Sequence, residues 1–480
     1  MAMRTRTEQG RLKLVPLAAA LALLAGCASF SPDGGFGAVE QTARDRLGKD
    51  VQRVRSDEDR QAVAGRVAEL LAQPLSADDA VQIALLNNRG LQAGFHELGI
   101  REAEVVRAGR LPNPTFSMFH ASKRENGVRD YKIEQALTFN IFSLLTMPQS
   151  VEVNRRVFEQ SQRAVSLQVL RLAADVRRAW VQAVAAGQTL RYTEQVMDAA
   201  DAGAELAKRM RAAGNHSALA EAREQGFRAD AALNLARAQQ AHVAARERLT
   251  RLLGLWGEQT AFALPDRLPD LPAAPLDAPD IERQAMGSRI DLQIAKLDAE
   301  ATARNLGLTK TTRFIDVLEV GPARVLEGRR SESYKKGYEI SFELPLFDWG
   351  GSKVARAEAI YMQSVERAAE AAVNARSEVR EAYTGYRTAF DIARHYRDEV
   401  VPLRKRVSDE NLLRYNGMLI GVFELLADAR AQVAGVNGYI EALRDFWIAQ
   451  ADLDMALVGR PDLAPPPGAA LSTAAADAAH

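Results

Sequence analysis

The side chains most often used in catalysis and metal binding are few in this chain and are scattered along it. No two of its six histidines stand at the HExxH spacing with which one helix holds a zinc ion. There is no GxxxxGK[ST] loop for nucleotide phosphates, and there is a single cysteine. We therefore expect a protein that is not an enzyme and that holds no cofactor or metal. The histidines are His96, His120, His216, His242, His395 and His480.

The single cysteine, Cys27, follows a segment that reads as a secretion signal. Four basic residues precede an apolar stretch at 14–25, which is too short to span a bilayer. The stretch ends in Leu24-Ala25-Gly26-Cys27, which resembles the bacterial lipobox. The resemblance implies that residues 1–26 are a signal peptide and that Cys27 is diacylated, and the absence of Asp after Cys27 favours sorting to the outer membrane. An ordinary signal peptide with an incidental cysteine is the alternative.

Composition points to closely packed helices and away from nucleic acid. The 480 residues are 47% hydrophobic but only 6% aromatic, and alanine is abundant, which favours helices over an all-β fold. Basic and acidic residues each number 62, and 58 against 61 remain when residues 1–26 are removed. A nearly neutral chain lacks the usual electrostatic basis for binding nucleic acid.

One structural plan occurs twice along the chain. Ala84-Leu85-Leu86-Asn87-Asn88 has a counterpart in Ala285-Met286-Gly287-Ser288-Arg289, 201 positions later, and the pair Val151 and Val354 shows an offset of 203. Farther on, residues 209–214 match residues 412–417. A repeat of this kind predicts two copies of one supersecondary unit. We expect a lipid-anchored segment at 27–74, repeats at 75–256 and 280–459, a Pro-rich linker at 257–279 and a disordered tail at 460–480.

Each repeat is predicted to form a helix, two strands and a very long helical stretch that is broken once by glycine. In the first repeat, Ser76 begins a helix that we expect to run to about Leu111, where Pro112 and Pro114 end it. The helical stretch at 151–213 would be ~95 Å long at 1.5 Å per residue. A plain coiled coil is the alternative, but it does not explain the strands.

The strands are expected at about 115–121 and 131–139 in the first repeat, and at about 314–320 and 338–346 in the second. In residues 131–139 and 338–346 apolar side chains alternate with polar ones, as in a transmembrane barrel strand with apolar residues outward. A half-buried sheet in a soluble domain has the same pattern. Four strands cannot close a barrel, and an open edge in lipid is excluded. Either the sheet lies outside the membrane, or several chains pool their strands.

Taken in order, these motifs resemble the TolC family of outer-membrane channel proteins, particularly the lipoproteins that work with resistance-nodulation-division pumps. The resemblance covers residues 75–459. It is carried by the Ala84 phrase above, by Ala108-Gly109-Arg110-Leu111-Pro112-Asn113-Pro114, by Leu344-Pro345-Leu346-Phe347-Asp348-Trp349-Gly350-Gly351, and by the phrases that begin at Gly214 and Gly417.

The resemblance implies a mainly α fold with a membrane β-barrel. The protomer would be a tandem repeat of long coiled-coil helices plus four β-strands, and a homotrimer would form a 12-stranded barrel and an α-helical periplasmic tunnel. The implied function is a passive exit duct in the cell outer membrane, which reaches into the periplasm to an adaptor protein and an inner-membrane pump. Its cargo would be heavy metal, as in copper efflux, or drugs. A structural coiled-coil lipoprotein without a pore is the main alternative, and an adaptor protein is another.

The same resemblance assigns roles to two helix tips and to one acidic pair. Gly214 and Asn215 at the first tip, and Gly417 and Met418 at the second, would face the adaptor. Glu424 and Asp428 stand four residues apart, and therefore on one helix face, just beyond the second tip. Repeated by threefold symmetry, they would form an acidic ring at a closable aperture. Solvated surface acids are the alternative. Tyr338 and Trp349 are candidates for aromatic anchors at a membrane interface, with ordinary packing as their alternative.

Overall fold

The computed structural model describes residues 29–314 and 317–463. The predicted signal peptide, Cys27 and most of the expected tail therefore lie outside the described residues. The chain divides into two compact units, and α6 (Ile141–Ala212) and α10 (Gly351–His395) supply residues to both. One unit consists of Met1–Gly37, His96–Ala164 and Gln293–Ala371, and the other of Ala38–Phe95, Val165–Leu292 and Ala372–His480.

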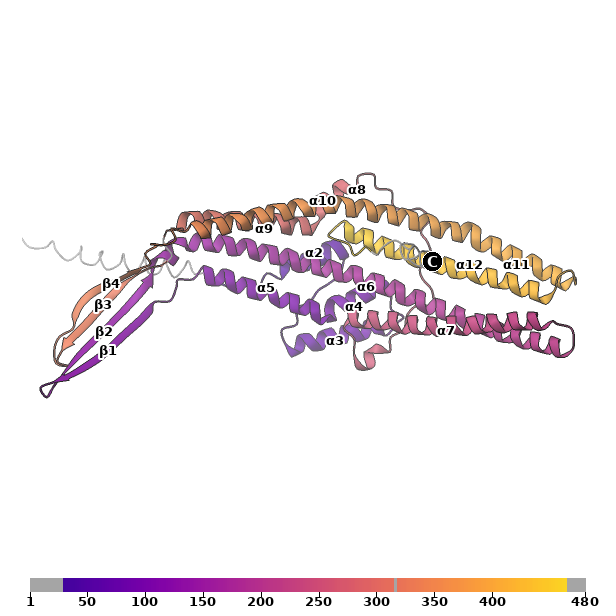
Figure 1. The fold of residues 1–480 in the computed structure, drawn as a ribbon, viewed down its shortest axis with the longest axis horizontal. Coiled ribbons are helices and arrows are strands. Elements are labelled where there is room, and N and C mark those ends of the chain that lie inside the picture. The colour runs from indigo at the N-terminus through magenta and orange to yellow at the C-terminus, as the bar shows by residue number, and fades with distance from the viewer. Residues whose placement is uncertain (1–28, 315–316, 464–480) are drawn as a thin grey trace, which may run out of the picture. The chain divides into compact units, whose positions relative to one another are not determined.

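The first unit contains a four-stranded antiparallel sheet in the order β1-β2-β3-β4 (Figure 1). Each repeat supplies one hairpin, and pairing of β2 with β3 joins the two hairpins. The first hairpin turns at Asn126 and Gly127, whose positive φ angles of 49° and 82° suit the tight two-residue turn that Asn-Gly favours. The strands are β1 (Thr115–Glu125), β2 (Val128–Asn140), β3 (Leu318–Gly328) and β4 (Lys335–Phe342).

The strand β3 differs most from the sequence prediction of 314–320, because it begins at Leu318 and continues to Gly328. Gly321 and Pro322 interrupt its alternation. A Cβ atom at Gly321 would lie 1.8 Å from the carbonyl oxygen of Leu137, and Pro322 has no N–H to donate. The other strands also shift: β1 and β2 are longer than predicted, and β4 ends at Phe342, before the region of Pro345.

Three of the helices also differ from the predicted bounds. The helix expected from Ser76 to about Leu111 is two helices, α4 (Ala77–Asn87) and α5 (Arg89–Ala108), with the break at Asn88. Asn88 has an extended backbone and its side chain accepts a hydrogen bond from the Leu91 N–H, so it caps α5. The long helix α6 begins at Ile141, earlier than the predicted 151.

In the first unit, α9 (Ile290–Thr312) packs against both long helices. Arg304 on α9 lies 3.3 Å from the Glu152 carboxylate on α6. On its other side, the hydroxyl groups of Thr302 and Ser364 are 2.7 Å apart, which ties α9 to α10. These contacts hold the segments that lead into and out of the sheet.

The second unit is a helical assembly with a core of alanine and a few aromatic rings. Phe446 on α12 (Val422–Ala456) packs against Tyr386 and Phe390 on α10, with ring centroids 5.5 and 5.8 Å away. Trp180 on α6 donates an indole hydrogen bond to the Leu75 carbonyl at 2.7 Å. The remaining helices are α2 (Gly37–Leu47), α3 (Asp57–Leu71), α7 (Ala218–Leu253), α8 (Ile281–Ser288) and α11 (Val401–Asn416).

A π-helical turn, Tyr396–Val400, joins α10 to α11 without a break. Pro402 just beyond it has no N–H, so the regular helical bonding pattern cannot run through this point. A π turn also accommodates one inserted residue. Among the described helices, none is long and apolar enough to cross a membrane.

Candidate functional site

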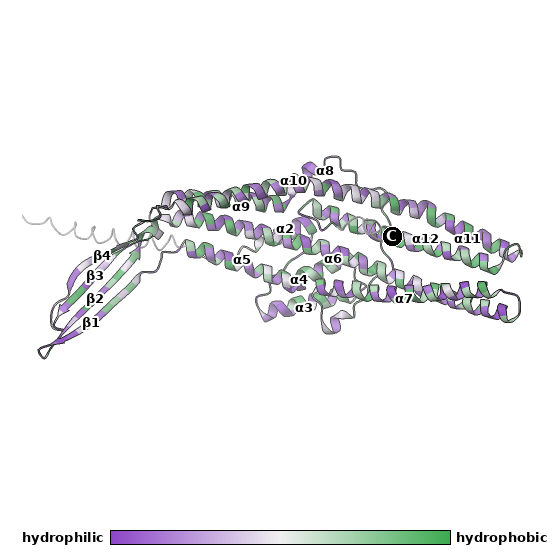
Figure 2. Cartoon of the chain, viewed as in Figure 1, coloured by the Kyte–Doolittle hydropathy of each residue, from purple (hydrophilic) through white to green (hydrophobic). Residues whose placement is uncertain are grey.

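The register of the sheet separates apolar from polar side chains onto opposite faces. Because successive side chains point to opposite sides and paired residues share a side, the faces follow from the strand partners. Figure 2 shows both kinds of residue along the strands. We define the apolar face by Phe116, Met118, Tyr131, Ile133, Leu137, Phe139, Leu318, Val320, Leu326, Tyr338, Ile340 and Phe342.

Much of the apolar face is exposed, although Leu326 is buried. Phe116 is 62% exposed, Tyr338 79% and Phe342 58%. A sheet of a soluble domain would cover this face with its core. On the polar face, Ala136 and Thr138 are buried and Phe119 is exposed. The apolar face therefore requires an apolar surrounding that the described part of the chain does not supply.

The polar face carries charged side chains from three strands. Lys132 pairs with Glu134 at 2.8 Å, and the Thr138 hydroxyl donates to Glu319 at 3.2 Å. Glu339 on β4 lies on the same face. These side chains suit a hydrated surface. Glu134 and Glu339 fall at polar positions of the predicted strands 131–139 and 338–346. Glu319 lies within the predicted strand 314–320, but that strand shows no clear alternation from which its role could be inferred.

Both outer strands of the sheet have an open edge within the described structure. β1 pairs only with β2, and β4 pairs only with β3. Each outer strand therefore presents a row of backbone N–H and C=O groups without strand partners. These edges are able to pair with strands of other chains.

The two helix tips have the same backbone geometry at different residues. At the first tip, Gly214 has φ 76°, and the N–H groups of Gly214 and Asn215 donate to the Arg211 and Met210 carbonyls. At the second, Met418 has φ 57°, and Met418 and Leu419 donate to Tyr415 and Arg414. Both are Schellman motifs. All four donor–acceptor distances are 2.9 Å.

The equivalent of Gly214 is therefore Met418, and the sequence alignment of Gly214 with Gly417 was one residue out of step. The offset between repeats is 204 at the tips, against 203 at Val151 and Val354. The π turn Tyr396–Val400 lies between these points and accommodates the extra residue. Met418 and Leu419 are 93% and 78% exposed, so the second tip presents apolar side chains.

The two tips contact each other through stacked rings. His216 in the first tip stacks on Phe423 at the start of α12, with centroids 4.1 Å apart and planes 15° from parallel. The helices that leave the tips begin differently. The Ser217 side chain caps α7 by accepting the Ala220 N–H, whereas Gly421 at the same place before α12 has no side chain to do so.

The predicted acidic pair lies on the first turns of α12. Glu424 is exposed in the first turn, and Asp428 is half-buried and accepts a hydrogen bond from Asn411 on α11. Sequence reasoning missed a third acid, Glu224, which is buried on α7 and paired with Arg430. The offset of 204 makes Glu224 the equivalent of Asp428. Aligning the two repeats with this offset would therefore have identified Glu224 from the sequence. Each repeat thus places one carboxylate at the equivalent position of the helix that follows its tip.

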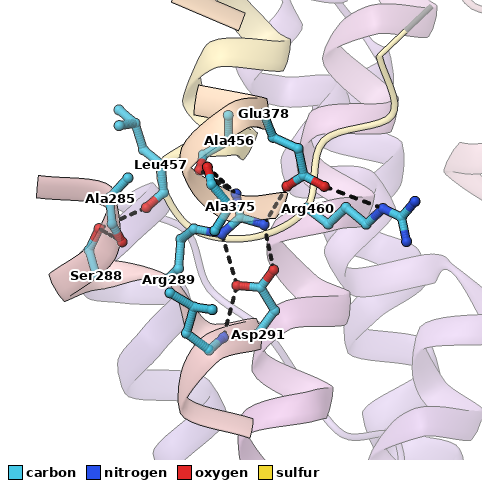
Figure 3. Close-up of polar contacts among 10 residues, drawn as sticks. Ala285, Ser288, Arg289, Asp291, Ala375, Glu378, Ala456, Leu457 and Arg460 are labelled. Atoms are coloured by element: carbon cyan, nitrogen blue, oxygen red, sulfur yellow. Dashed lines mark hydrogen bonds and ion pairs between the residues drawn. The ribbon is translucent and has the colours of Figure 1, made fainter. Parts of the chain in front are cut away.

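Two equivalent junctions join the start of each repeat to its end. In the first, the amide groups of Asn87 and Asn88 donate to the last carbonyls of α7, at Leu253 and Leu252, over 3.1 and 2.9 Å. In the second, Ser288 donates to Leu457 at 2.7 Å and Arg289 to Ala456 at 3.4 Å (Figure 3). In both repeats, side chains near the start of the repeat thus donate hydrogen bonds to carbonyls at its end.

The second junction is ionic, unlike the first. Arg289 is only 1% exposed, and it donates to Asp291 at 2.5 Å and to Glu378 at 2.7 Å (Figure 3). Burial alone would lower the pKa of the guanidinium, but the two carboxylates outweigh it and raise the pKa. Arg460 lies 3.6 Å from Glu378 and adds a second cation.

Within residues 29–314 and 317–463, no group of three or more His, Cys, Asp or Glu side chains could hold a metal ion. The features that remain are an exposed apolar sheet face, open strand edges and paired helix tips. Residues 80–255 match the family model described as Outer membrane efflux protein. Residues 80–255 belong to the outer membrane efflux protein family. The resemblance to an outer-membrane channel family that was inferred from sequence is confirmed. The prediction that the chain is not an enzyme is also confirmed, because the matched family consists of efflux proteins.

One named relative and two solved structures are also similar to this chain. The cobalt-zinc-cadmium resistance protein CzcC of Cupriavidus metallidurans is 26% identical over 282 residues, which are 58% of this chain and 64% of that protein. A membrane protein of Pseudomonas aeruginosa has the same fold, with a TM-score of 0.66 and 20% identity over 79% of this chain and 93% of its own. CusC, whose structures concern transmembrane channel formation, also has the same fold, with a TM-score of 0.65. Its sequence identity is 17%, and the match covers 80% of this chain and 92% of CusC. The predicted fold of the protomer, with long helices and a small antiparallel sheet, is confirmed.

Proposed function

We propose that this protein is the passive outer-membrane exit duct of a tripartite efflux system. Three chains would each contribute β1–β4 to a closed twelve-stranded barrel, with the apolar face toward lipid and the polar face toward a wet lumen. The long helices would continue as a tunnel through the periplasm. A homotrimer is the assembly that the family resemblance implies.

The observation that carries this proposal is the exposed apolar face of a sheet with two open edges. In hydrocarbon, unpaired edge groups cost several kcal/mol each, so a sheet there must close on itself. Bacterial barrels begin at eight strands, and one chain supplies four. Pairing of β1 with the β4 of a neighbouring chain removes both edges at once.

The helix tips would dock a periplasmic adaptor protein, which links the duct to an inner-membrane pump. Gly214 and Asn215 at the first tip, and Gly417 and Met418 at the second, are the residues we assign to this surface. The exposed Met418 and Leu419 favour an apolar contact at the second tip. Diacylated Cys27 would anchor the mature chain in the lipid of the outer membrane.

We assign the cargo to the class of heavy-metal cations rather than drugs. The support is the relative named for cobalt, zinc and cadmium resistance. A duct need not bind what it passes, which fits the lack of a metal-holding cluster among the described side chains. Loss of tolerance to cobalt, zinc or cadmium, with drug tolerance unchanged, on deletion of the gene would support this cargo; the reverse pattern would contradict it.

Glu424 and Asp428 would form an acidic ring where the three second tips converge. Carboxylates repeated around a narrow aperture attract cations and repel anions. Glu424 also lies in the first turn of α12, where a negative charge is favourable to the helix dipole. That local role explains Glu424 alone and not Asp428, which bonds to Asn411.

The test is single-channel recording in planar bilayers with the full-length, lipid-modified protein. We expect the double variant Glu424→Ala plus Asp428→Ala to lose cation selectivity or to change conductance at least twofold. Glu441 and Asp445 stand at the same spacing farther along α12 and provide a matched double-alanine control. Unchanged conductance and selectivity in the Glu424 and Asp428 variant would remove the ring, and no pore from the unaltered protein would contradict the duct.

A further inference from the structure

One cross-strand row of the apolar face is not apolar. From the helical end of the sheet toward the hairpin turns, the rows contain Leu318 and Phe342, then Phe139, Val320 and Ile340, then Phe116, Leu137 and Tyr338. The next row contains Met118, Gln135, Arg324 and Lys336. Arg324 and Lys336 are direct partners on neighbouring strands.

Like charges placed directly opposite each other destabilise a sheet. Within the described structure, neither Arg324 nor Lys336 forms an ion pair with a carboxylate. Arg324 donates to the neutral side chain of Gln135 at 2.6 Å, and its guanidinium lies 4.9 Å from the centre of the Tyr334 ring. The neighbouring acids Glu327 and Glu339 lie on the polar face. An anion from outside the chain would relieve the repulsion between these two exposed cations.

The location of this cationic row limits which anion it can meet. Lys336 lies six residues from Phe342, roughly 20 Å along the strand, and exposed apolar side chains continue beyond Phe342 at Leu344 and Leu346. Such a length is comparable with the ~25 Å apolar band of an outer-membrane barrel. Tyr334 and Tyr338 flank the row, and tyrosine is enriched where a membrane meets water.

The turn ends of both hairpins add to the positive charge. Residues 123–130 and 324–336 contain eight basic residues and four acidic ones. Glu327 pairs with Lys335 at 3.4 Å, on the polar face. In the proposed duct, the surplus positive charge of this end would lie where the headgroups of a membrane leaflet begin.

We propose that Arg324 and Lys336 bind the phosphate groups of lipid headgroups at the outer edge of the apolar face. The inference rests on the proposed function, because the duct is what sets the apolar face against lipid. A guanidinium and an ammonium side by side supply charge-assisted hydrogen bonds to one phosphate, and the anion relieves their mutual repulsion. A lipid with more than one phosphate would bridge rows on adjacent chains.

The experiment is native mass spectrometry of the full-length protein in detergent, titrated with bisphosphorylated lipid A. We expect Arg324→Gln plus Lys336→Gln to weaken lipid A binding about tenfold, since two charge-assisted contacts are lost. Lys335→Gln is the matched control, because Lys335 neighbours Lys336 but lies on the polar face, and its affinity should stay within twofold. The unaltered protein should also bind dephosphorylated lipid A about tenfold more weakly.

Three results would overturn the inference. The first is retention of the unaltered protein's affinity by the double variant, and the second is equally tight binding of lipid A without its phosphates. The third is displacement of the lipid by inorganic phosphate at equal concentration. Bilayer recordings on the same preparation separate the two proposals. Pores without phosphate-dependent binding would remove the headgroup site alone, whereas a chain that forms neither trimers nor pores would remove the duct and the headgroup site with it.

Discussion

The two repeats fasten their helices at equivalent places with different chemistry. At the first junction two neutral amides, Asn87 and Asn88, bind the last carbonyls of α7. At the second, the corresponding side chains are Ser288 and Arg289, and Arg289 adds two carboxylates. The backbone arrangement is shared, while the side chains that maintain it have diverged.

The helix tips differ in the same manner. Both use a left-handed residue to end a long helix, but the first repeat has Gly214 there and the second has Met418. A glycine adopts this conformation without strain, whereas a side chain costs about 1–2 kcal/mol. The comparison teaches that the geometry of each connection is required, and that the second repeat tolerates strain and buried charge to reach it.

The largest effect should follow from Arg289→Met at the second junction. The change leaves the carboxylates of Asp291 and Glu378, which are 21% and 16% exposed, without their shared cation. We expect a loss of about 3 kcal/mol in stability, measured by thermal unfolding in detergent with circular dichroism. Adding Asp291→Asn and Glu378→Gln should recover most of it. A loss no greater than that of the first-junction variant would end the distinction between ionic and neutral junctions.

A smaller loss is expected from Asn88→Ala at the first junction. The change removes the cap of α5 and the hydrogen bond to Leu252, which together contribute about 1–2 kcal/mol. Asn88→Asp is the control, because it keeps the cap acceptor and loses only the amide donor. Its melting temperature should therefore lie between those of Asn88→Ala and the unaltered protein. Identical melting temperatures for Asn88→Ala and the unaltered protein would mean that the junction contributes nothing.

Reciprocal substitutions at the tips should change stability by about 1 kcal/mol or less, in opposite directions. Gly214→Ala introduces strain without a clash, since nothing lies within 4 Å of the added Cβ, and should destabilise the protein. Met418→Gly relieves strain, partly offset by the greater freedom of glycine when unfolded, and should stabilise it slightly. The same thermal unfolding measures both. Destabilisation by Met418→Gly would show that the methionine side chain makes a contact that outweighs its strain.

The smallest effect should be a pH dependence that only the first repeat carries. Burial, with Arg246 and Arg191 nearby, lowers the pKa of His242, and the offset of 204 places Phe446 at the same position in the second repeat. A lowered histidine pKa means that the folded state loses stability as the pH falls from about 7 through that pKa. We expect the melting temperature to fall from pH 7 to pH 5, and to fall less in His242→Phe. The control is His395→Phe, because His395 is exposed. If the melting temperature of His242→Phe fell with pH as steeply as that of the unaltered protein, groups other than His242 would cause the pH dependence.

Much of this architecture could be predicted from the sequence because its periodicities are strong. The repeat, the Asn-Gly hairpin and the alternation in residues 131–139 each report a local rule that tertiary packing did not override. β3 was misplaced because Gly321 and Pro322 break the alternation at the point where the Leu137 carbonyl approaches. The break at Asn88 was missed because a capping side chain inside an apolar run reads as continuous helix.

The site was only partly accessible from sequence. The pair Glu424 and Asp428 follows from helical spacing, but Glu224 becomes visible only with the correct offset between repeats. That offset changes by one residue at the π turn Tyr396–Val400, which no simple periodicity marks. The cationic row of Arg324 and Lys336 required the register of β3 with β4, which single strands do not contain.

The central claim is that three copies of this chain close one barrel by pairing β1 with β4 across chains. Single-particle imaging of the full-length protein, extracted from the outer membrane in detergent, tests it most directly. We expect a hollow threefold particle whose barrel contains twelve strands, continuous with a helical tunnel. A monomer with an open sheet, or a solid helical rod, would contradict it and leave a structural lipoprotein in its place.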